Sequence, residues 1–387
     1  MLPAPVGVSA AAQMQEGTLQ MASRPKRLSI FLPSLAGGGA EKSMLRLAHG
    51  LAMRGYSVDL VLARAEGPYL TSVPDVVRVV NLNGSRVLSS LPALVRYLRH
   101  EQPDALLSSL DYANIVALWA RRLARVPLRL VVNEQNTISL TSQHSSQWRQ
   151  RMMPRLVRHF YPWADHIIGN SQGVADDLSR ITGLPRNRIQ VIYNPVVTPE
   201  LAEKVAAGPD HPWLEVGQPP VLLGVGRLTE QKDFPTLIQA FARVRQLRPL
   251  RLLILGDGSA RSALEALIRH LHLEQDVSLP GFVENPYAYM SRASLFILSS
   301  RWEGLPTVLI EALFCGVRVI STDCPSGPRE ILADGQHGAL IPVQDVTALA
   351  KTIVLAMDGG IPSPSAESWR PYVLENVVHQ YLQILLG

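Results

Sequence analysis

Two glutamates, Glu303 and Glu311, have the setting in this sequence that most strongly indicates chemistry. Glu303 lies in a polar turn after an apolar run at residues 295–299, and Glu311 lies within an apolar helix expected after Pro306. Burying a carboxylate near a sheet costs several kcal/mol unless a partner compensates the charge. The two carboxylates are therefore expected to hold a ligand.

A pair of cations, Arg227 and Lys232, follows another apolar run at residues 221–225. Arg227 comes directly after Gly226, and Lys232 lies just before an expected helix. Permanent cations at the carboxyl end of a strand and beside a helix N-terminus form a site for a diphosphate. The alternative is two ordinary solvent-exposed cations, which the Gly-x-Gly-Arg turn makes the weaker interpretation.

Glycine-rich turns follow two further expected strands. Residues 37–39 are three glycines, and Gly38 and Gly39 would let backbone N–H groups approach an anion or a sugar closely. Nicotinamide cofactor binding is not expected, because the dinucleotide spacing is missing and no acidic residue ends the second strand. In the second turn, residues 256–258, the lone aspartate is interpreted as a turn or cap residue.

The composition is that of a globular protein large enough for two domains. The chain has 387 residues, of which 47% are hydrophobic and 18% charged. No window approaches about 18 uninterrupted apolar residues, so no transmembrane helix is expected. Residues 1–24 lack the basic start and apolar core of a signal peptide, and they are interpreted as a flexible tail. Two cysteines, Cys315 and Cys324, make neither a disulfide framework nor a zinc site, which favours a reducing, cytoplasmic compartment.

Positive charge is concentrated in the first half of the chain. Residues 1–200 contain 22 Lys and Arg against 13 Asp and Glu, whereas residues 201–387 contain 15 against 19. The first half is therefore the part expected to face an anionic partner. Nucleic acid is not the expected partner, since no nucleic-acid motif accompanies the charge.

A run of arginines at residues 149–158 has two interpretations. The arginines lie beside apolar residues at helical spacing, although Pro154 weakens the prediction of a continuous helix. The pattern fits an amphipathic basic helix on an anionic membrane surface and, equally, a solvated arginine face over an ordinary core stripe. The arginines are Arg149, Arg151, Arg155 and Arg158, and the apolar residues are Trp148, Met152, Leu156 and Phe160.

Short apolar runs alternate with amphipathic stretches along the chain, as in parallel βαβ units. We expect an α/β fold with two Rossmann-like domains whose parallel sheets face an interdomain cleft. A proline-rich stretch, residues 195–220, separates an N-terminal domain at 25–198 from a C-terminal domain at 199–367, and residues 368–387 form a final segment. The expected strands are at residues 28–32, 57–62, 76–82, 105–108, 128–133, 166–170, 221–225, 251–255, 277–279, 295–299, 318–321 and 339–341.

Several motifs of the second half, taken in order, resemble one known family. They are GVGRLTEQKDF, LILGDG, LPGFVENPYAYM, SSRWEGLPTVLIEALFCGVRVISTD and GPREIL. This ordered set is similar to the retaining, nucleotide-sugar-dependent glycosyltransferases of family 4, which have the GT-B fold and include many bacterial surface-polysaccharide enzymes. The resemblance covers roughly residue 28 to the C-terminus. It implies that the final segment is a helix crossing back to the N-terminal domain.

The resemblance also implies a role for each cation and carboxylate. Arg227 and Lys232 would neutralise the donor diphosphate, so that neither a metal nor another cofactor is implied. Glu303 would lie near the donor sugar and its reacting face, and Glu311 would bind the ribose hydroxyls. The remaining donor-binding residues implied are Gly226, Gly256, Phe282 and Val283 near the nucleotide, and Gly304, Leu305, Pro306 and Thr307 at the start of the following helix.

Two places depart from the family pattern. The turn at the first glutamate reads EGLPT, a variant typical of capsule, lipopolysaccharide and N-acetylhexosamine transferases, where many members read EGFGL. On the donor-sugar and acceptor side, Glu134, Gln135 and Asn136 stand where related sequences often have Glu-His-Asn, and the Gln135 amide cannot titrate. Asp111 is an alternative acceptor-side carboxylate, or the cap of the helix that follows.

The predicted reaction is transfer of a hexose or N-acetylhexosamine from a nucleotide-diphosphate sugar, expected to be UDP-linked, to a lipid-linked or polysaccharide hydroxyl. Retention at the anomeric carbon is implied, and same-face attack is favoured over a covalent route because no base is evident in the N-terminal domain. The expected location is cytoplasmic, peripheral on the inner face of the membrane. The alternatives are a non-catalytic nucleotide-sugar-binding subunit of a polysaccharide assembly complex, or another GT-B enzyme such as a nucleotide-sugar epimerase. An oxidoreductase is disfavoured because the dinucleotide fingerprint is missing.

Overall fold

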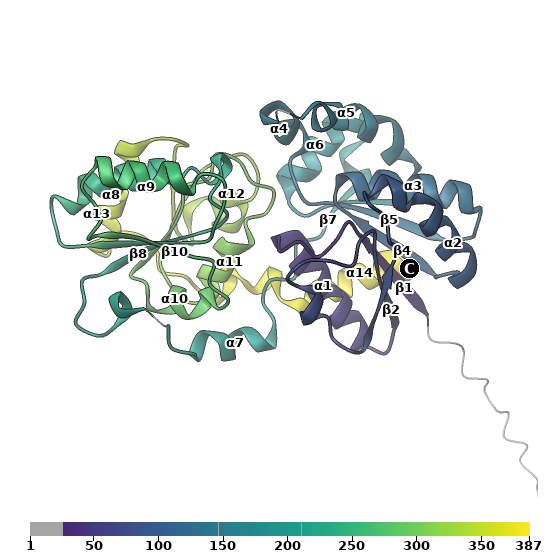
Figure 1. Ribbon diagram of the computed structural model, residues 1–387, viewed down its shortest axis with the longest axis horizontal. Coiled ribbons are helices and arrows are strands. Elements are labelled where there is room, and N and C mark those ends of the chain that lie inside the picture. Colours follow the sequence, from purple (N-terminus) through teal and green to yellow (C-terminus); the bar gives the residue numbers. More distant parts are fainter. Residues whose placement is uncertain (1–25, 146, 210) are drawn as a thin grey trace, which may run out of the picture.

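Two α/β domains lie side by side along the long axis of the molecule (Figure 1). The computed structural model describes residues 26–145, 147–209 and 211–387, so the expected tail at residues 1–24 lies outside the described residues. Each domain has one parallel sheet with helices on both faces. The expected fold class is confirmed, and strands buried on both faces explain why the sequence shows continuous apolar runs.

The N-terminal sheet has the strand order β3-β2-β1-β4-β5-β6-β7, and every neighbouring pair is parallel. Six of these strands coincide with expected runs. The seventh, β7, is not among them, because its three residues include a glutamine and form a short edge strand beside β6. The strands are β1 (Arg27–Leu32), β2 (Ser57–Leu62), β3 (Val77–Asn81), β4 (Ala105–Ser109), β5 (Arg129–Glu134), β6 (His166–Gly169) and β7 (Ile189–Val191).

Two groups of helices cover this sheet. The helices are α1 (Gly39–Ala52), α2 (Leu91–Glu101), α3 (Asp111–Ala124), α4 (Ile138–His144), α5 (Trp148–Phe160) and α6 (Gln172–Thr182). α1 packs on the face that contains Ile30, together with α14 (Leu374–Leu386), the last helix of the chain. α2, α3, α5 and α6 pack on the opposite face, which contains Phe31. Successive residues of one strand thus enter opposite cores.

The C-terminal sheet has the order β10-β9-β8-β11-β12-β13 and is also parallel. Its order reverses between β8 and β11, the kind of switch point beside which ligands bind in open parallel sheets. The strands are β8 (Val221–Val225), β9 (Arg251–Leu255), β10 (Val277–Gly281), β11 (Leu295–Leu298), β12 (Val319–Thr322) and β13 (Ala339–Ile341).

The helices of the C-terminal domain also form two layers. The helices are α7 (Pro199–Ala206), α8 (Phe234–Arg245), α9 (Arg261–His270), α10 (Pro286–Arg292), α11 (Thr307–Phe314), α12 (Pro328–Ile331) and α13 (Val346–Met357). α8, α9 and α13 share one hydrophobic core, and α7, α10, α11 and α12 share the other. The helix that carries Glu311 is thus in the layer shared with α10.

α14 returns from the C-terminal domain and packs on the N-terminal domain. Val377 and Tyr381 are fully buried in the core shared with α1, and the Asn133 amide donates to the Tyr381 hydroxyl at 2.5 Å. The Arg129 guanidinium binds the carbonyl oxygens of Ile384 and Gly387 at 3.0 and 2.7 Å. A cation at a helix C-terminus donates hydrogen bonds to the free carbonyl groups and interacts favourably with the negative end of the helix dipole. These contacts attach the end of the chain to β5.

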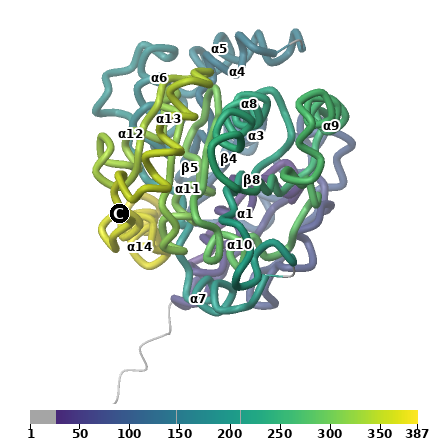
Figure 2. Tube along the Cα trace, turned by 90° about the vertical axis from the view of Figure 1, so that its left-hand side faces the viewer, coloured from purple at the N-terminus to yellow at the C-terminus, as the bar shows by residue number. Residues whose placement is uncertain are grey.

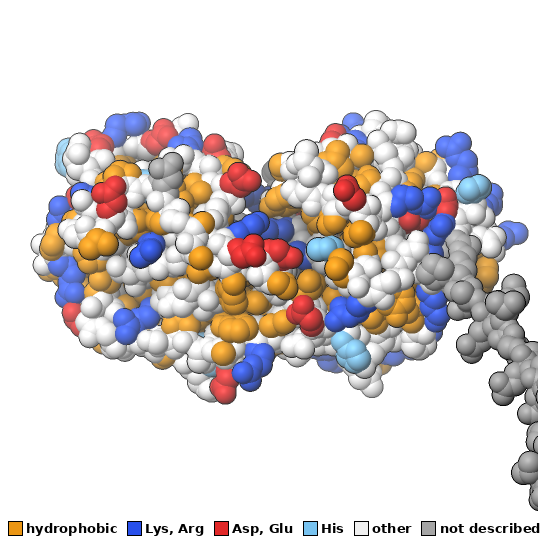
Figure 3. Space-filling model, turned by 90° about the horizontal axis from the view of Figure 1, so that it is seen from below, with side chains coloured by type: hydrophobic (Ala, Val, Ile, Leu, Met, Phe, Trp, Pro, Cys, Tyr) orange, Lys and Arg blue, Asp and Glu red, His pale blue; other side chains and the backbone are white. Residues whose placement is uncertain are grey.

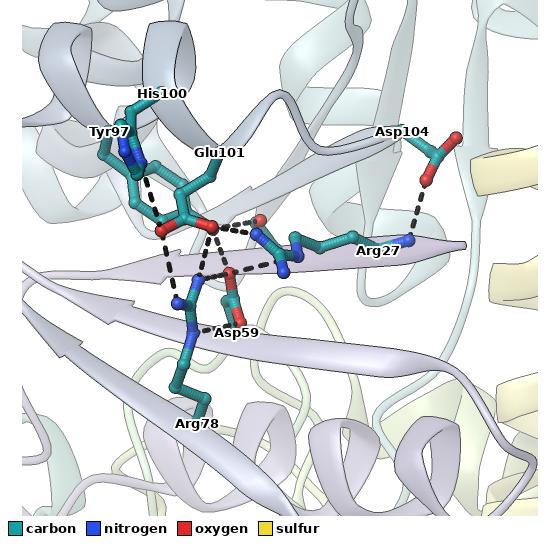
Figure 4. A network of polar contacts seen from close by, with 8 residues as sticks. Arg27, Asp59, Arg78, Tyr97, His100, Glu101 and Asp104 are labelled. Carbon is teal, nitrogen blue, oxygen red and sulfur yellow. Dashed lines mark hydrogen bonds and ion pairs between the residues drawn. The ribbon is translucent and has the colours of Figure 1, made fainter. Parts of the chain in front are cut away.

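A network of polar contacts joins β1, β2, β3 and α2 (Figure 4). Asp59, which is 1% exposed, accepts hydrogen bonds from Arg78 Nε at 2.8 Å and from the Tyr97 hydroxyl at 2.6 Å. Glu101 pairs with Arg27 and, at 3.0 Å, with Arg78. The network fastens the edge strand β3 to the rest of the sheet.

Candidate active site in the interdomain cleft

The carboxyl ends of both sheets open onto one cleft with a volume of about 670 Å³. Its walls are formed by the turns after β1, β5, β6 and β7 on one side and after β8, β9, β10 and β11 on the other. Seen from below, the two lobes meet at a waist where side chains of both charges gather (Figure 3). Parallel sheets offer ligands the loops at their carboxyl ends, and a cleft of this size suits a small-molecule ligand.

Glu303 is held in the cleft by groups from three segments. Lys232 Nζ lies 2.6 Å from Glu303 Oε1, and the Ser300 hydroxyl donates to the same oxygen at 2.6 Å. The Thr137 hydroxyl of the N-terminal domain donates to the backbone carbonyl of Glu303 at 3.0 Å. The carboxylate is thus charge-compensated from its own domain, while its backbone contacts the opposite domain.

The turns after β8 and β9 lie in contact and present Arg227. Gly256 has a φ of +130°, and a Cβ there would lie 2.1 Å from the carbonyl oxygen of Gly226. Only glycine allows these two turns to approach so closely. Arg227 is exposed on the cleft wall and has no ion pair within the part of the chain that the structure describes. Its guanidinium is available for an anionic ligand.

Glu311 is surrounded by partners from both domains. The Tyr287 hydroxyl of α10 donates to Glu311 Oε1 at 2.9 Å. From α1 of the N-terminal domain, Lys42 Nζ lies 3.4 Å and an Arg46 guanidinium nitrogen 3.6 Å from the same oxygen. Glu311 is therefore a buried carboxylate at the junction of the two domains.

Three amides form the N-terminal wall of the cleft. Gln135, 4% exposed, accepts hydrogen bonds on Oε1 from Asn170 Nδ2 at 3.0 Å and Asn194 Nδ2 at 2.8 Å. Asn170 Nδ2 also donates to the Gln135 backbone carbonyl at 3.1 Å, which establishes which end of its amide is the donor. Gln135 Nε2 has no hydrogen-bond partner among the described residues. The wall thus contains an unpaired donor that cannot titrate.

Glu134 and Asp111 lie behind the cleft wall. Glu134 accepts from the backbone N–H groups of Gln135 and Asn136 at 3.0 and 3.3 Å and from the Tyr161 hydroxyl at 2.7 Å. Burial, together with the nearby Asp111 charge, raises the pKa of Glu134 to about 8. Burial likewise raises the pKa of Asp111 to about 6, and this carboxylate accepts from the Tyr112 N–H at 2.7 Å. Glu134 therefore positions the turn that carries Gln135.

Most of the residues expected from sequence meet in this cleft. Glu134, Asp111 and Pro306 are not among its lining residues. Several lining residues were missed, namely Lys42, Gln231, Asn170 and Asn194. Asn170 could have been found, because it ends an expected strand of a parallel sheet, where ligand-facing side chains gather, whereas Asn194 follows β7, which was not expected. The expected residues that line the cleft are Gly38, Gly39, Gln135, Asn136, Gly226, Arg227, Lys232, Gly256, Phe282, Val283, Glu303, Gly304, Leu305, Thr307 and Glu311.

Neither a metal site nor a membrane-spanning helix is evident in the described ranges. No three His, Cys, Asp or Glu side chains of residues 26–145, 147–209 and 211–387 gather as ligands for a metal ion. Across the same residues, no helix combines the length and apolar character needed to cross a bilayer.

Two Rossmann-like domains with a cleft between facing sheets are the architecture of the GT-B glycosyltransferases. Anabaena HepE, solved in complex with UDP, superposes with a TM-score of 0.72 at 23% identity, covering 93% of this chain and 99% of that one. The lipopolysaccharide outer core galactosyltransferase WaaB superposes with a TM-score of 0.70 at 19% identity, with coverages of 93% and 99%. The expected GT-B fold is confirmed.

Sequence comparison identifies the family. The model for Glycosyltransferase Family 4 matches residues 37–199, and the model for Glycosyl transferases group 1 matches residues 211–373. A Campylobacter jejuni N-acetylgalactosamine-N,N'-diacetylbacillosaminyl-diphospho-undecaprenol 4-alpha-N-acetylgalactosaminyltransferase is 31% identical over 84% of this chain and 88% of its own length. The Rhizobium meliloti lipopolysaccharide core biosynthesis glycosyltransferase LpsE is 27% identical over 90% of this chain and 96% of its own. The chain belongs to this glycosyltransferase family, and the resemblance seen in its motifs is confirmed.

Proposed function

We propose that this glycosyltransferase moves a hexose or N-acetylhexosamine from UDP to a hydroxyl of a lipid-linked or polysaccharide acceptor in surface glycan biosynthesis, with retention. The observation that carries the proposal is the grouping of Arg227, Lys232 and Glu303 on one wall of the interdomain cleft. The donor assignment is supported by the UDP bound to HepE. The acceptor class is supported by relatives whose names specify undecaprenol-linked and lipopolysaccharide substrates.

In the proposed reaction, the acceptor oxygen attacks the anomeric carbon while the bond from that carbon to the UDP phosphate breaks. The acceptor proton passes to a phosphate oxygen of the departing UDP. Arg227 and Lys232 would stabilise the negative charge that develops on the diphosphate, which is the electrostatic contribution expected of fixed cations. Glu303 Oε1 already binds Lys232 and Ser300, whereas the hydrogen bond from Gln231 Nε2 to Oε2 is longer, at 3.5 Å, so Glu303 would accept from sugar hydroxyls through Oε2.

Same-face attack is supported by the groups on the N-terminal wall. A covalent route needs a carboxylate close beneath the anomeric carbon. Gln135 is a neutral amide, and Glu134, whose two oxygens already accept hydrogen bonds, does not line the cleft. Glu41 lines the cleft but folds back on Gly38, where a Cβ would lie 2.3 Å from Glu41 Oε2. The proposed retaining step therefore uses the donor phosphate as the base.

A panel of nucleotide sugars tests the proposal. We expect slow hydrolysis of a UDP-sugar and, with an acceptor lipid, a product of unchanged anomeric configuration by NMR. Arg227→Ala and Glu303→Ala should each lower kcat/KM by about 10²–10³-fold, because each removes charge stabilisation at the reacting centre. Arg243→Ala, at an exposed arginine of α8, is the matched control and should leave turnover unchanged. Binding without turnover, even with acceptor lipid, would instead indicate a non-catalytic subunit, and absence of nucleotide-sugar binding would contradict both.

We also propose that the N-terminal domain contacts an anionic membrane through α5. Between Glu134 and Asp165 the sequence contains no acidic residue. Arg151, Arg155 and Arg158 are exposed on α5, which Pro154 does not interrupt. Within residues 26–145, 147–209 and 211–387, no carboxylate forms an ion pair with these three arginines. Unpaired cations on one face are attracted to anionic lipid headgroups.

The apolar stripe expected on α5 is divided between the core and the surface. Leu156 and Phe160 pack against the domain core, whereas Trp148 is 70% exposed at the start of the helix. The membrane contact would therefore be electrostatic, with Trp148 as the interfacial side chain. α4 and α5 lie along the edge of the molecule opposite α7 (Figures 1 and 2). His144 of α4 stacks on Trp302, with 4.4 Å between the ring centroids. Trp302 precedes Glu303 in the chain, so this edge adjoins the cleft.

Liposome binding tests this contact. Arg151→Gln/Arg155→Gln/Arg158→Gln should bind vesicles containing anionic lipid more weakly by about 3 kcal/mol at low salt, since each cation near the surface contributes about 1 kcal/mol. The matched control, Arg243→Gln/Arg269→Gln/Lys351→Gln, removes three exposed cations from the C-terminal domain and should bind as the wild type does. Equal losses in both variants would show only a nonspecific charge effect, and unchanged binding would contradict the proposal.

A further inference from the structure

Lys42 and Arg46 of α1 contact Glu311 from across the interdomain cleft. Lys42 Nζ and an Arg46 guanidinium nitrogen lie 3.4 and 3.6 Å from Glu311 Oε1. Lys42 lines the cleft, and its ammonium group also donates to the Tyr287 hydroxyl. Glu311 therefore obtains its compensating positive charge from the N-terminal domain, although it belongs to the C-terminal domain.

Because Glu311 is buried, its ion pairs with Lys42 and Arg46 matter for its stability in the fold. Glu311 is 6% exposed, and a buried carboxylate without a cation is strongly disfavoured. Burial lowers the pKa of Lys42, and the Glu311 carboxylate opposes that effect. Separation of the domains would remove both cations from Glu311.

The geometry leaves one oxygen of Glu311 for a ligand. The shortest contacts of Lys42, Arg46 and Tyr287 all use Oε1, and Glu311 lines the cleft. Oε2 is therefore the oxygen that could accept a hydrogen bond from a ligand hydroxyl. A carboxylate oxygen is a strong hydrogen-bond acceptor.

Arg46 extends the cluster to the chain segment between the domains. Its guanidinium also donates to the Pro195 carbonyl at 3.3 Å and to the Tyr287 hydroxyl at 3.3 Å. α1 begins at Gly39, and α11 begins at Thr307. A Cβ on Gly39 would lie 3.2 Å from Thr307 Oγ1. The helix that supplies the cations therefore starts at the glycine turn of the cleft and contacts the helix of Glu311.

We propose that Lys42 and Arg46 are positioning residues for nucleotide binding, because their contacts with Oε1 hold the Glu311 side chain in place and leave Oε2 for the ribose hydroxyls. This inference rests on the proposed function and on the role that the family resemblance implies for Glu311, which is to bind the ribose of UDP. It makes the affinity of the C-terminal domain for nucleotide depend on side chains of the opposite domain. Nucleotide affinity and contact between the domains are then linked through one carboxylate.

Calorimetric titration with UDP tests the inference through a double-mutant cycle. Lys42→Met should weaken UDP binding by about tenfold, and Lys42→Arg should restore it to within about threefold, because the cation is retained. In the Glu311→Gln background the same Lys42→Met change should alter the dissociation constant by less than about twofold. Lys351→Met, at an exposed lysine of α13, is the matched control and should bind UDP as the wild type does.

A second ligand separates an effect through Glu311 from direct phosphate binding by Lys42. With 2′,3′-dideoxy-UDP, which lacks both ribose hydroxyls, Lys42→Met should change the affinity by less than about twofold. The inference is overturned if the loss is the same with and without the hydroxyls, if it persists in Glu311→Gln, or if Lys42→Met binds UDP normally. Failure of the wild type itself to bind UDP would instead overturn the proposed function. Thermal unfolding of each variant shows that the compared proteins are folded.

Discussion

Glu303 lies in the turn before α11 and Glu311 lies within that helix, yet the two carboxylates have different cations as partners. Lys232, from the same domain, binds Glu303 at 2.6 Å, whereas Lys42, from the opposite domain, lies 3.4 Å from Glu311. Two carboxylates that each bind a cation of their own are poor candidates for an acid and base couple, because neither contacts the other. At the residue scale they are better interpreted as two separate ligand contacts along one nucleotide sugar.

The buried carboxyl group of Glu134 predicts a pH dependence of stability. Its pKa is raised from an ordinary 4.5 to about 8, so the stability contributed by the protonated form is fully present below 4.5 and is lost as pH rises through 8. The free energy of unfolding of the wild type should therefore fall across this range relative to that of Glu134→Gln, which keeps a neutral side chain. Chemical denaturation at several pH values measures the difference. Glu367→Gln, at an exposed acid, should retain the wild-type slope, and a wild-type slope in Glu134→Gln would contradict the assignment.

At the scale of elements, the edge strand β3 depends on the network around Asp59. Arg78 of β3 and Tyr97 of α2 both bind this buried carboxylate (Figure 4). Asp59→Ala should destabilise the protein by about 1.5–3 kcal/mol, because it removes charge-assisted hydrogen bonds from the half-exposed Arg78 and from the buried Tyr97 hydroxyl. Urea denaturation provides the measurement. Asp75→Ala, at an exposed aspartate before β3, should change stability by no more than about 0.5 kcal/mol, and equal losses would contradict a special role for Asp59.

At the scale of the whole molecule, glycines allow the two domains to meet. A Cβ on Gly304 would lie 2.1 Å from the backbone carbonyl oxygen of Gln135, and one on Gly173 would lie 2.7 Å from Ser326. Between them, the Ser171 and Ser326 hydroxyls lie 2.7 Å apart, and the Gln172 N–H donates to Glu330 at 2.9 Å. The two domains thus approach so closely at Gly304 and Gly173 that a larger side chain at either position would clash with the opposite domain.

A side chain at Gly173 should hold the domains apart. Gly173 lies outside the lining of the cleft, so Gly173→Val tests the approach of the domains without altering a ligand contact. We expect a larger radius of gyration by small-angle X-ray scattering and a fall of about a hundredfold in kcat/KM, since misplacement by about 1 Å disrupts reactive geometry. Gly208→Val, where a Cβ meets nothing within 4 Å, is the matched control. Wild-type scattering and activity in Gly173→Val would contradict this prediction.

Features that depend on short-range pattern could be predicted from the sequence. Buried parallel strands produce continuous apolar runs, so twelve of the thirteen strands in residues 26–145, 147–209 and 211–387 could be placed, and among these the short β7 escaped. Motif spacing likewise identified Arg227, Lys232, Glu303 and Glu311, because each lies in a turn or helix that directly follows a strand. Their presence in one cleft follows from the carboxyl ends of parallel strands meeting at one edge.

Contacts between side chains that are distant in sequence became known from the folded structure. Lys42 reaches Glu311 across the cleft, and Asn170 and Asn194 orient Gln135 from two other strand ends. Glu134, adjacent to Gln135 in sequence, turns away and is buried behind the wall. These pairings have no signal in local sequence, because they depend on the order of strands in each sheet and on how closely the two domains approach.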